Sequence, residues 1–167
     1  MSKRKKDNHG ACASGVKSEK SLKKAAEQTG VKFLKTVKEF EKVGLSRDSM
    51  IGKVYHIPPP HWNQKTPTGR QRTYIADGFI IKEDKGVIIE QKHSDKKGTT
   101  EEKVFYDLKK IQHGVYGDAY PLWYVFTGKQ CKNIEAYREF EKEAKREGLS
   151  VKIIWGLEEF KKELKKL

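Results

Sequence analysis

The sequence predicts a mixed α/β fold in which helices flank both faces of a β-sheet. Short apolar runs bounded by turn residues alternate with segments whose apolar residues recur at helical spacing. Three of the short runs follow one another with only loops between them, which favours antiparallel pairing. The later runs are separated by helical segments and must pair by crossovers. The 167 residues suffice for one domain with a buried core.

The first half of the chain is expected to hold the three successive strands. Residues 1–16 are polar and rich in Gly and Lys, so we expect a basic disordered tail ahead of a domain at 17–167. The prolines at 58–60 end the first strand, and residues 83–86 form a hairpin turn in which Gly86 suits a positive φ. The elements expected here are helices at about 18–28 and 33–43 and strands at 51–57, 72–82 and 87–93. The second helix is expected because five apolar residues share one face: Phe33, Leu34, Val37, Phe40 and Val43.

The second half of the chain is expected to alternate helices and strands. Apolar residues three and four positions apart predict the helices, and uninterrupted apolar runs predict buried strands. The elements expected here are helices at about 99–112, 133–147 and 157–167 and strands at 122–127 and 151–155.

The charge pattern indicates a protein that works on a polyanion. Lys and Arg number 36 against 23 Asp and Glu, which gives a net charge of +13. Residues 49–76 contain no acidic residue, so this stretch could approach phosphates without local repulsion. The next acidic residue is Asp77. A basic approach that ends at an isolated carboxylate indicates a phosphate-handling site.

Cysteine usage and hydropathy exclude several classes of protein. Cys12 and Cys131 provide neither a disulfide framework nor a CxxC zinc pair. The first ten residues lack the apolar segment of a secretory signal, and no apolar run approaches the roughly 18 residues that span a membrane. We therefore expect a cytoplasmic protein with no membrane contact.

Asp77, Glu90 and Lys92 are the candidate catalytic residues. Each lies in an otherwise apolar strand, where a charge is costly to bury unless something compensates it. Side chains alternate along a strand, so Glu90 and Lys92 point to one face and Gln91 to the other. The hairpin brings Asp77 beside Glu90. Two carboxylates beside a lysine fit a Mg²⁺ site that activates water against a phosphodiester. The alternative is a structural Glu90–Lys92 ion pair with Asp77 in a turn.

This pattern resembles the PD-(D/E)xK nuclease superfamily, whose members are restriction-endonuclease-like. The shared features are Asp77, twelve intervening residues, Glu90-x-Lys92 and an expected αβββαβ element order over roughly 31–127, followed by a C-terminal helix–strand–helix extension. Ala76 stands where some members carry proline. The resemblance implies Mg²⁺-dependent hydrolysis of DNA by a homodimer, leaving 5′-phosphates, with Mn²⁺ as a possible substitute. It implies metal binding by Asp77, Glu90 and Gln91.

Further site residues follow from the resemblance and from charge. Glu41 and Glu102 are the candidate additional acids of the active site, with Glu41 expected to face inward. Either could instead be structural, Glu41 as a surface residue and Glu102 in a capping box with Thr99. The candidate DNA-contacting residues are Trp62, Lys65, Arg70, Gln71, Arg72, His93 and Lys103. The segment around Arg70 could also be a solvated loop.

Three functions remain open from the sequence. The first is a DNA endonuclease most like a type II restriction enzyme. The second is a structure-selective nuclease of the same superfamily, such as a Holliday junction resolvase or a repair nuclease. The third is a basic nucleic-acid-binding protein without catalysis.

Overall fold

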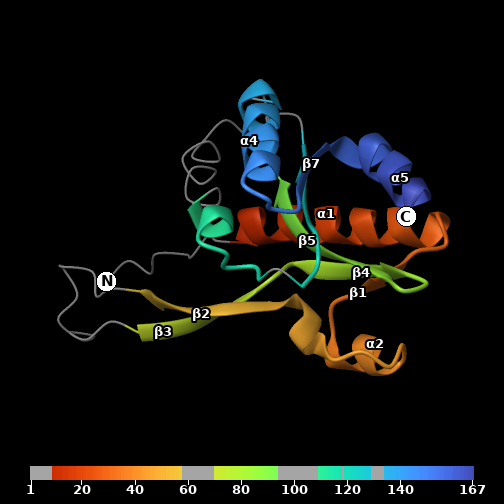
Figure 1. Cartoon of the computed structure of the whole chain (residues 1–167). Helices are drawn as coiled ribbons and strands as arrows, with labels where there is room; N and C mark the ends of the chain where they lie inside the picture. The colour runs from red at the N-terminus through yellow and green to blue at the C-terminus, as the bar shows by residue number, and fades with distance from the viewer. Residues whose placement is uncertain (1–8, 58–69, 94–108, 118, 129–133) are drawn as a thin grey trace, which may run out of the picture.

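The chain forms one five-stranded sheet, a separate two-stranded sheet and helices on both sides (Figure 1). The computed structural model describes the main chain of residues 9–57, 70–93, 109–117, 119–128 and 134–167, and the side chains of 18–48, 75–93 and most of the later described residues. The helices are α1 (His9–Gln28), α2 (Val37–Glu41), α4 (Ile134–Arg146) and α5 (Gly156–Lys166). The strands are β1 (Lys32–Leu34), β2 (Ile51–Ile57), β3 (Arg70–Ile75), β4 (Gly78–Lys82), β5 (Lys85–His93), β6 (Leu122–Thr127) and β7 (Val151–Trp155).

The main sheet has the strand order β1-β4-β5-β6-β7. β1, β4 and β5 pair antiparallel, whereas β5, β6 and β7 pair parallel. The parallel strands are joined through segments long enough for crossovers, as the sequence predicts. The expected mixed α/β architecture, with helices flanking a mixed sheet, is therefore confirmed.

Helices cover the two faces of the main sheet with separate apolar clusters. On one face, α1 and α5 pack beside each other against the sheet (Figure 1). Their buried contacts include Leu22 and Phe160, both fully buried. On the other face lie α4, α2 and the turn at 109–116, around Phe40 and Phe79. Both faces of the central strands are thus covered, which explains why β6 is buried along its whole length.

The β4–β5 hairpin turns more tightly than expected. Lys82 pairs with Lys85, so only Glu83 and Asp84 form the turn, and Glu83 adopts the positive φ of 56°. The prediction that Gly86 supplies the positive φ is wrong. Gly86 lies inside β5, where an added Cβ would be 2.4 Å from Cζ of Phe79. This glycine is required by the close approach of an aromatic ring rather than by turn geometry.

The predicted helix at 33–43 is wrong at its start. Phe33 and Leu34 belong to β1 and pair with β4. The helix begins only after Thr36, whose hydroxyl accepts from the main-chain N of Glu39 while the Glu39 carboxylate bonds back, a complete capping box. Burial raises the pKa of Glu39, but the hydrogen bonds from Lys23 and from the main chain at Thr36 and Lys35 outweigh it and lower the pKa to about 2.

Three further features differ from the prediction. The expected strand at 72–82 is broken at Ala76 and Asp77 into β3 and β4. β2 pairs with β3 alone, so the strand at 51–57 is present but belongs to the two-stranded sheet rather than to the main one. α1 starts at His9 instead of Ser18. Of the helix expected at 99–112, only residues 109–112 are described, and they form a helical turn.

The strands at 122–127 and 151–155 have the predicted bounds, and α4 and α5 lie within a residue of theirs. Within the described ranges, no helix is long and apolar enough to cross a lipid bilayer.

Candidate active site

Asp77 meets β5 through a side-chain hydrogen bond. It is the residue before β4, and Gly78 is paired with Ile89, so Asp77 is level with Glu90. Its Oδ2 accepts a hydrogen bond of 2.8 Å from the main-chain N of Gln91. The carboxylate thus continues the ladder beyond the end of β4, which accounts for the break between β3 and β4. This bond also anchors Asp77 beside the predicted catalytic strand.

Glu90 and Lys92 lie together on the α4-facing side of β5. They share this face with Ile88, as strand alternation predicts. Glu90 is only 5% exposed, and its Oε1 lies 3.2 Å from Nζ of Lys92. The Lys92 ammonium also lies 5.6 Å from the centroid of the Tyr124 ring on β6. A buried carboxylate and a partly exposed ammonium are therefore held next to each other.

The electrostatics of the site centre on Asp77. Burial raises the pKa of the Asp77 carboxyl, and the hydrogen bond from Gln91 and the positive charge of Lys92 oppose this. The negative charge of Glu19 on α1 raises the pKa of Asp77 further, while Lys35 lowers it. Glu19 and Lys35 form an ion pair of 2.5 Å with each other. A cation bound between Asp77 and Glu90 would lower the free-energy cost of burying their two carboxylates.

The two carboxylates fit an open Mg²⁺ site, which water and phosphate complete, better than a closed metal site in which every ligand comes from the protein. Two carboxylates, Asp77 and Glu90, are brought level by the β4–β5 register. Mg²⁺ is usually held by one or two carboxylates, with waters and substrate phosphate completing its shell. Among the described side chains, no group of three or more His, Cys, Asp or Glu gathers into a closed metal cage. Gln91 turns its side chain to the opposite face, so only its main chain lies on the side of Asp77.

Polar side chains cluster behind the candidate site, on the α1-facing side of β5. Gln91 Nε2 donates to Ser18 on α1 and, at 3.4 Å, to Oγ1 of Thr127 at the end of β6. The prediction of the site contained neither Ser18 nor Thr127, nor the nearby Glu19. One signal was available for Ser18: it lies four residues before Leu22 on the apolar stripe of α1. Thr127 is the polar residue that ends an otherwise apolar strand.

The remaining predicted residues are not gathered at this point. Glu41 is exposed at the end of α2, so the expectation that it faces inward is wrong. His93 ends β5, and its Nδ1 lies 3.0 Å from Oγ1 of Thr127. Arg70, Gln71 and Arg72 lie on β3, whose side chains there are not described. The residues that lie outside the described ranges are Trp62, Lys65, Glu102 and Lys103.

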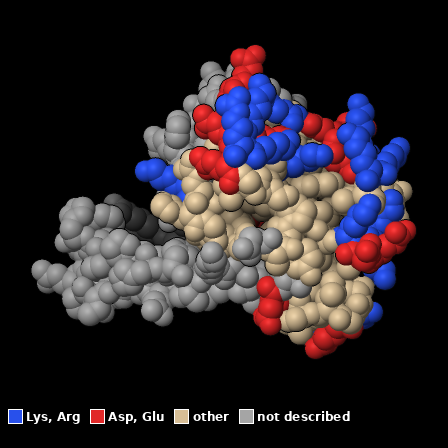
Figure 2. All heavy atoms as spheres, in the orientation of Figure 1, with Lys and Arg blue, Asp and Glu red and all other residues tan. Residues whose placement is uncertain are grey.

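Charges of both signs cover the visible outer surfaces of α4 and α5. Figure 2 shows Lys and Arg side chains interleaved with acidic ones over these helices. Ion pairs account for part of this, including Lys142 with Glu139 at 2.6 Å and Lys161 with Glu158 at 3.1 Å. These two helices therefore present solvated, mixed-charge surfaces rather than a basic patch.

Comparisons with protein-family models, with curated proteins and with solved structures found no match to this chain.

Proposed function

We propose that the protein is a Mg²⁺-dependent DNA endonuclease of the PD-(D/E)xK type, with Asp77, Glu90 and Lys92 as its catalytic residues. The observation that carries the proposal is the buried Glu90 carboxylate, level with Asp77 and 3.2 Å from the Lys92 ammonium. Replacing such a charged group by apolar residues rarely lowers stability, so a structural role alone explains it poorly. The group also lies toward the carboxyl ends of the parallel strands β5 and β6, where α/β sheets commonly bind ligands.

The order of elements supports the same proposal. α1, β1, β4 and β5 occur in this order along the chain, with α2, β2 and β3 between β1 and β4, and β6 pairs parallel to β5. Apart from this insertion, the order is a helix, three antiparallel strands and a parallel fourth strand. The αβββαβ order expected from the resemblance is therefore assigned to a different first helix and first strand from those predicted.

Each catalytic residue has a distinct task in the proposed mechanism. Asp77 and Glu90 would hold Mg²⁺, which when bound would supply a Lewis acid and a water of lowered pKa. Lys92 orients the attacking water and stabilises the negative charge that develops on the phosphate in the transition state. Attack of water on phosphorus, with departure of the 3′ oxygen, leaves a 5′-phosphate and a 3′-hydroxyl.

The β2–β3 hairpin is the proposed DNA-contacting arm. It extends away from the main sheet in Figure 1, and β3 leads directly into Asp77. Arg72 is five residues before Asp77, a distance of at most about 17 Å along extended chain. A phosphate contact by Arg72 would thus fall within one duplex width of the cutting site, and one by Arg70 would lie up to about 7 Å farther along the chain.

A plasmid assay tests the proposed function. Wild-type protein with Mg²⁺ is expected to nick or linearise supercoiled DNA, and a chelator should stop it. Glu90→Gln should abolish cutting and leave DNA binding intact, whereas the matched exposed control Glu139→Gln should cut like wild type. If wild-type protein binds DNA but cuts no DNA with Mg²⁺ or Mn²⁺, the third function, nucleic-acid binding without catalysis, replaces this one.

The same assay separates the two nuclease alternatives. Discrete fragments from linear DNA indicate that a base sequence is recognised, as in a type II restriction enzyme. Cutting confined to junctions, flaps or mismatches indicates a structure-selective nuclease. Because one chain supplies one such centre, we also propose a homodimer for double-strand cutting; light scattering of the DNA complex should give two chains, and a one-chain complex that cuts both strands would contradict this.

A further inference from the structure

The side chain of Gln91 links the candidate catalytic strand to two neighbouring elements. Gln91 lies between Glu90 and Lys92 but points to the opposite face of the sheet. Its Nε2 donates to the hydroxyls of Ser18 and Thr127, which themselves share a hydrogen bond of 2.6 Å. Ser18 and Thr127 are 6% and 8% exposed. Three elements, α1, β5 and β6, are thus tied at one buried point.

The same point is held through the main chain. Oγ1 of Thr127 donates to the carbonyl of Lys92 at 3.4 Å, and the main-chain N of Gln91 donates to Asp77 at 2.8 Å. Residues 90–92 are therefore held along both edges of β5, by Asp77 beside β4 and by Thr127 on β6. Since the three residues share one stretch of main chain, a twist of the main chain at Gln91 would also change the directions of Glu90 and Lys92.

Stability alone does not call for polar groups at this position. α1 packs on the sheet through Leu22, Ala25 and Ala26, all buried and apolar. An apolar contact in place of the hydroxyls would pack as well, whereas buried polar groups must be hydrogen-bonded merely to offset their desolvation. Oε1 of Gln91 is buried and has no hydrogen-bond partner among the described residues, so the network is satisfied through Nε2 only. Buried hydrogen-bond networks do, however, impose one arrangement on the residues that they join.

We propose that Ser18 and Thr127 are positioning residues that act through Gln91 to set the directions of Glu90 and Lys92. This inference rests on the proposed nuclease function. Residues that orient metal ligands from behind typically change metal affinity or activity by about 10–100-fold when they are replaced. An effect of that size is expected here without loss of the fold.

The test compares Thr127→Val, which removes the hydroxyl at nearly constant shape, with Thr127→Ser, which keeps it. Thr29→Val is the matched control, because the Thr29 hydroxyl bonds only within the end of α1, to the Ala26 carbonyl at 2.8 Å. Thr127→Val should lower kcat about 10-fold or more at unchanged KM for DNA and weaken Mn²⁺ binding, measured by calorimetry without DNA. Thr127→Ser should restore both, and all three variants should melt within a few degrees of wild type.

The outcomes separate this inference from the proposed function. If wild-type protein cuts DNA and Thr127→Val matches it in kcat and Mn²⁺ affinity, the positioning role is wrong and the nuclease function stands. If Thr127→Val loses activity only in proportion to lost folded protein, the role is structural and the inference is likewise overturned. A wild-type protein that neither binds Mn²⁺ nor cuts overturns the proposed function and this inference with it.

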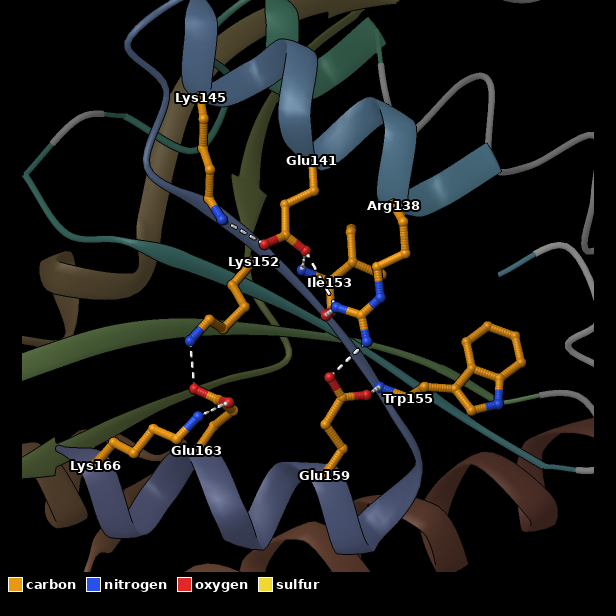
Figure 3. Close-up of polar contacts among 9 residues, drawn as sticks. All are labelled: Arg138, Glu141, Lys145, Lys152, Ile153, Trp155, Glu159, Glu163 and Lys166. Carbon is orange, nitrogen blue, oxygen red and sulfur yellow. Dashed lines mark hydrogen bonds and ion pairs between the residues drawn. The ribbon is translucent and has the colours of Figure 1, made fainter. Parts of the chain in front are cut away.

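A second inference concerns the outer edge of β7 and does not depend on the nuclease function. β7 ends the main sheet, and an unpaired edge strand offers its N–H and C=O groups to another chain. In this protein, side chains form hydrogen bonds with those main-chain groups (Figure 3). The main-chain N of Ile153 donates to Glu141 at 2.9 Å, and that of Trp155 donates to Glu159 at 2.8 Å. Arg138 donates to the Ile153 carbonyl at 2.7 Å and to Glu159 at 2.5 Å.

We infer that Arg138, Glu141 and Glu159 close the β7 edge to strand pairing with a second copy of this chain. The three side chains come from α4 and α5 and replace a neighbouring strand at alternate positions of β7. A homodimer must therefore form through another surface.

Amide exchange and solution mass test this closure. In wild-type protein the amides of Ile153 and Trp155 should be protected, and in Glu141→Ala/Glu159→Ala they should exchange at least about tenfold faster. The Ile154 amide, on the side of β7 that faces β6, should stay protected and report that the variant is folded. This double variant should also self-associate with rising concentration, unlike the exposed control Glu139→Ala. Unprotected Ile153 and Trp155 amides in wild type, or a folded double variant with unchanged mass at all concentrations, would overturn the inference.

Discussion

Replacing Asp77 by Asn and by Ala separates its contribution to the fold from its contribution to chemistry. The Asp77 carboxylate accepts a 2.8 Å hydrogen bond from the main-chain N of Gln91 in a half-buried position. Ala leaves that N–H without its acceptor, which costs about 1–3 kcal/mol. At roughly 2–4 °C per kcal/mol for a domain of this size, the melting temperature should fall by roughly 2–12 °C. Asn can accept the same bond and buries no charge, so its stability should stay within about 1 kcal/mol of wild type.

The catalytic expectation for the two variants is the same. Neither Asn nor Ala supplies a carboxylate to Mg²⁺, so both should cut plasmid DNA at least about 100-fold more slowly than wild type. Thermal unfolding without metal and plasmid cleavage with Mg²⁺ are the two assays. Asp84→Asn, in the exposed turn of the same hairpin, is the matched control. An Asn variant that unfolds as early as the Ala variant would refute the hydrogen-bond argument, and an Asn variant that cuts normally would refute the carboxylate's catalytic role.

Three further predictions concern the fold around the site. The pKa of Glu39 is about 2 against an ordinary 4.5, so this carboxylate stabilises the fold above about pH 4.5 and loses that contribution as the pH falls toward 2. Glu39→Gln should therefore lower the free energy of urea unfolding by about 1–2 kcal/mol at pH 7 and by much less at pH 2.5. An equal loss at both pH values would contradict the lowered pKa. Gly86→Ala should lower stability by about 1–3 kcal/mol because its Cβ would lie 2.4 Å from a Phe79 ring atom, and unchanged thermal unfolding would show that the ring moves freely. Glu90→Met with Lys92→Met should leave stability equal to wild type or up to about 1 kcal/mol higher while ending cleavage; a large loss of stability would favour the structural ion pair instead.

The sequence predicted the later strands well because each is a continuous apolar run whose burial needs no knowledge of its partner. The strands at 122–127 and 151–155 have the expected bounds. The same logic failed for Phe33 and Leu34, which fit the helical spacing of Val37 and Phe40 yet pair with β4 some 46 residues later. Local periodicity carries no information on such long-range pairing, and the capping box at Thr36 marked the helix start more reliably.

The candidate site was predictable where it depends on alternation and not where it depends on packing between distant elements. Glu90 and Lys92 lie on one face, as their spacing requires. Asp77 was expected inside a continuous strand. Instead it lies between β3 and β4, and its carboxylate accepts the hydrogen bond from the main-chain N of Gln91 that a strand carbonyl would otherwise accept. Ser18 and Thr127 meet Gln91 across 73 and 36 residues of sequence. The packing of α1 on the sheet brings Ser18 there, and the parallel pairing of β6 with β5 brings Thr127.

Anomalous diffraction from crystals grown with Mn²⁺ and DNA tests whether Asp77 and Glu90 hold one divalent cation between them. We expect an anomalous peak about 2 Å from a carboxylate oxygen of each residue, and no such peak in Asp77→Asn crystals. An empty site at saturating Mn²⁺, or an ion bound elsewhere while DNA is cut, would contradict it.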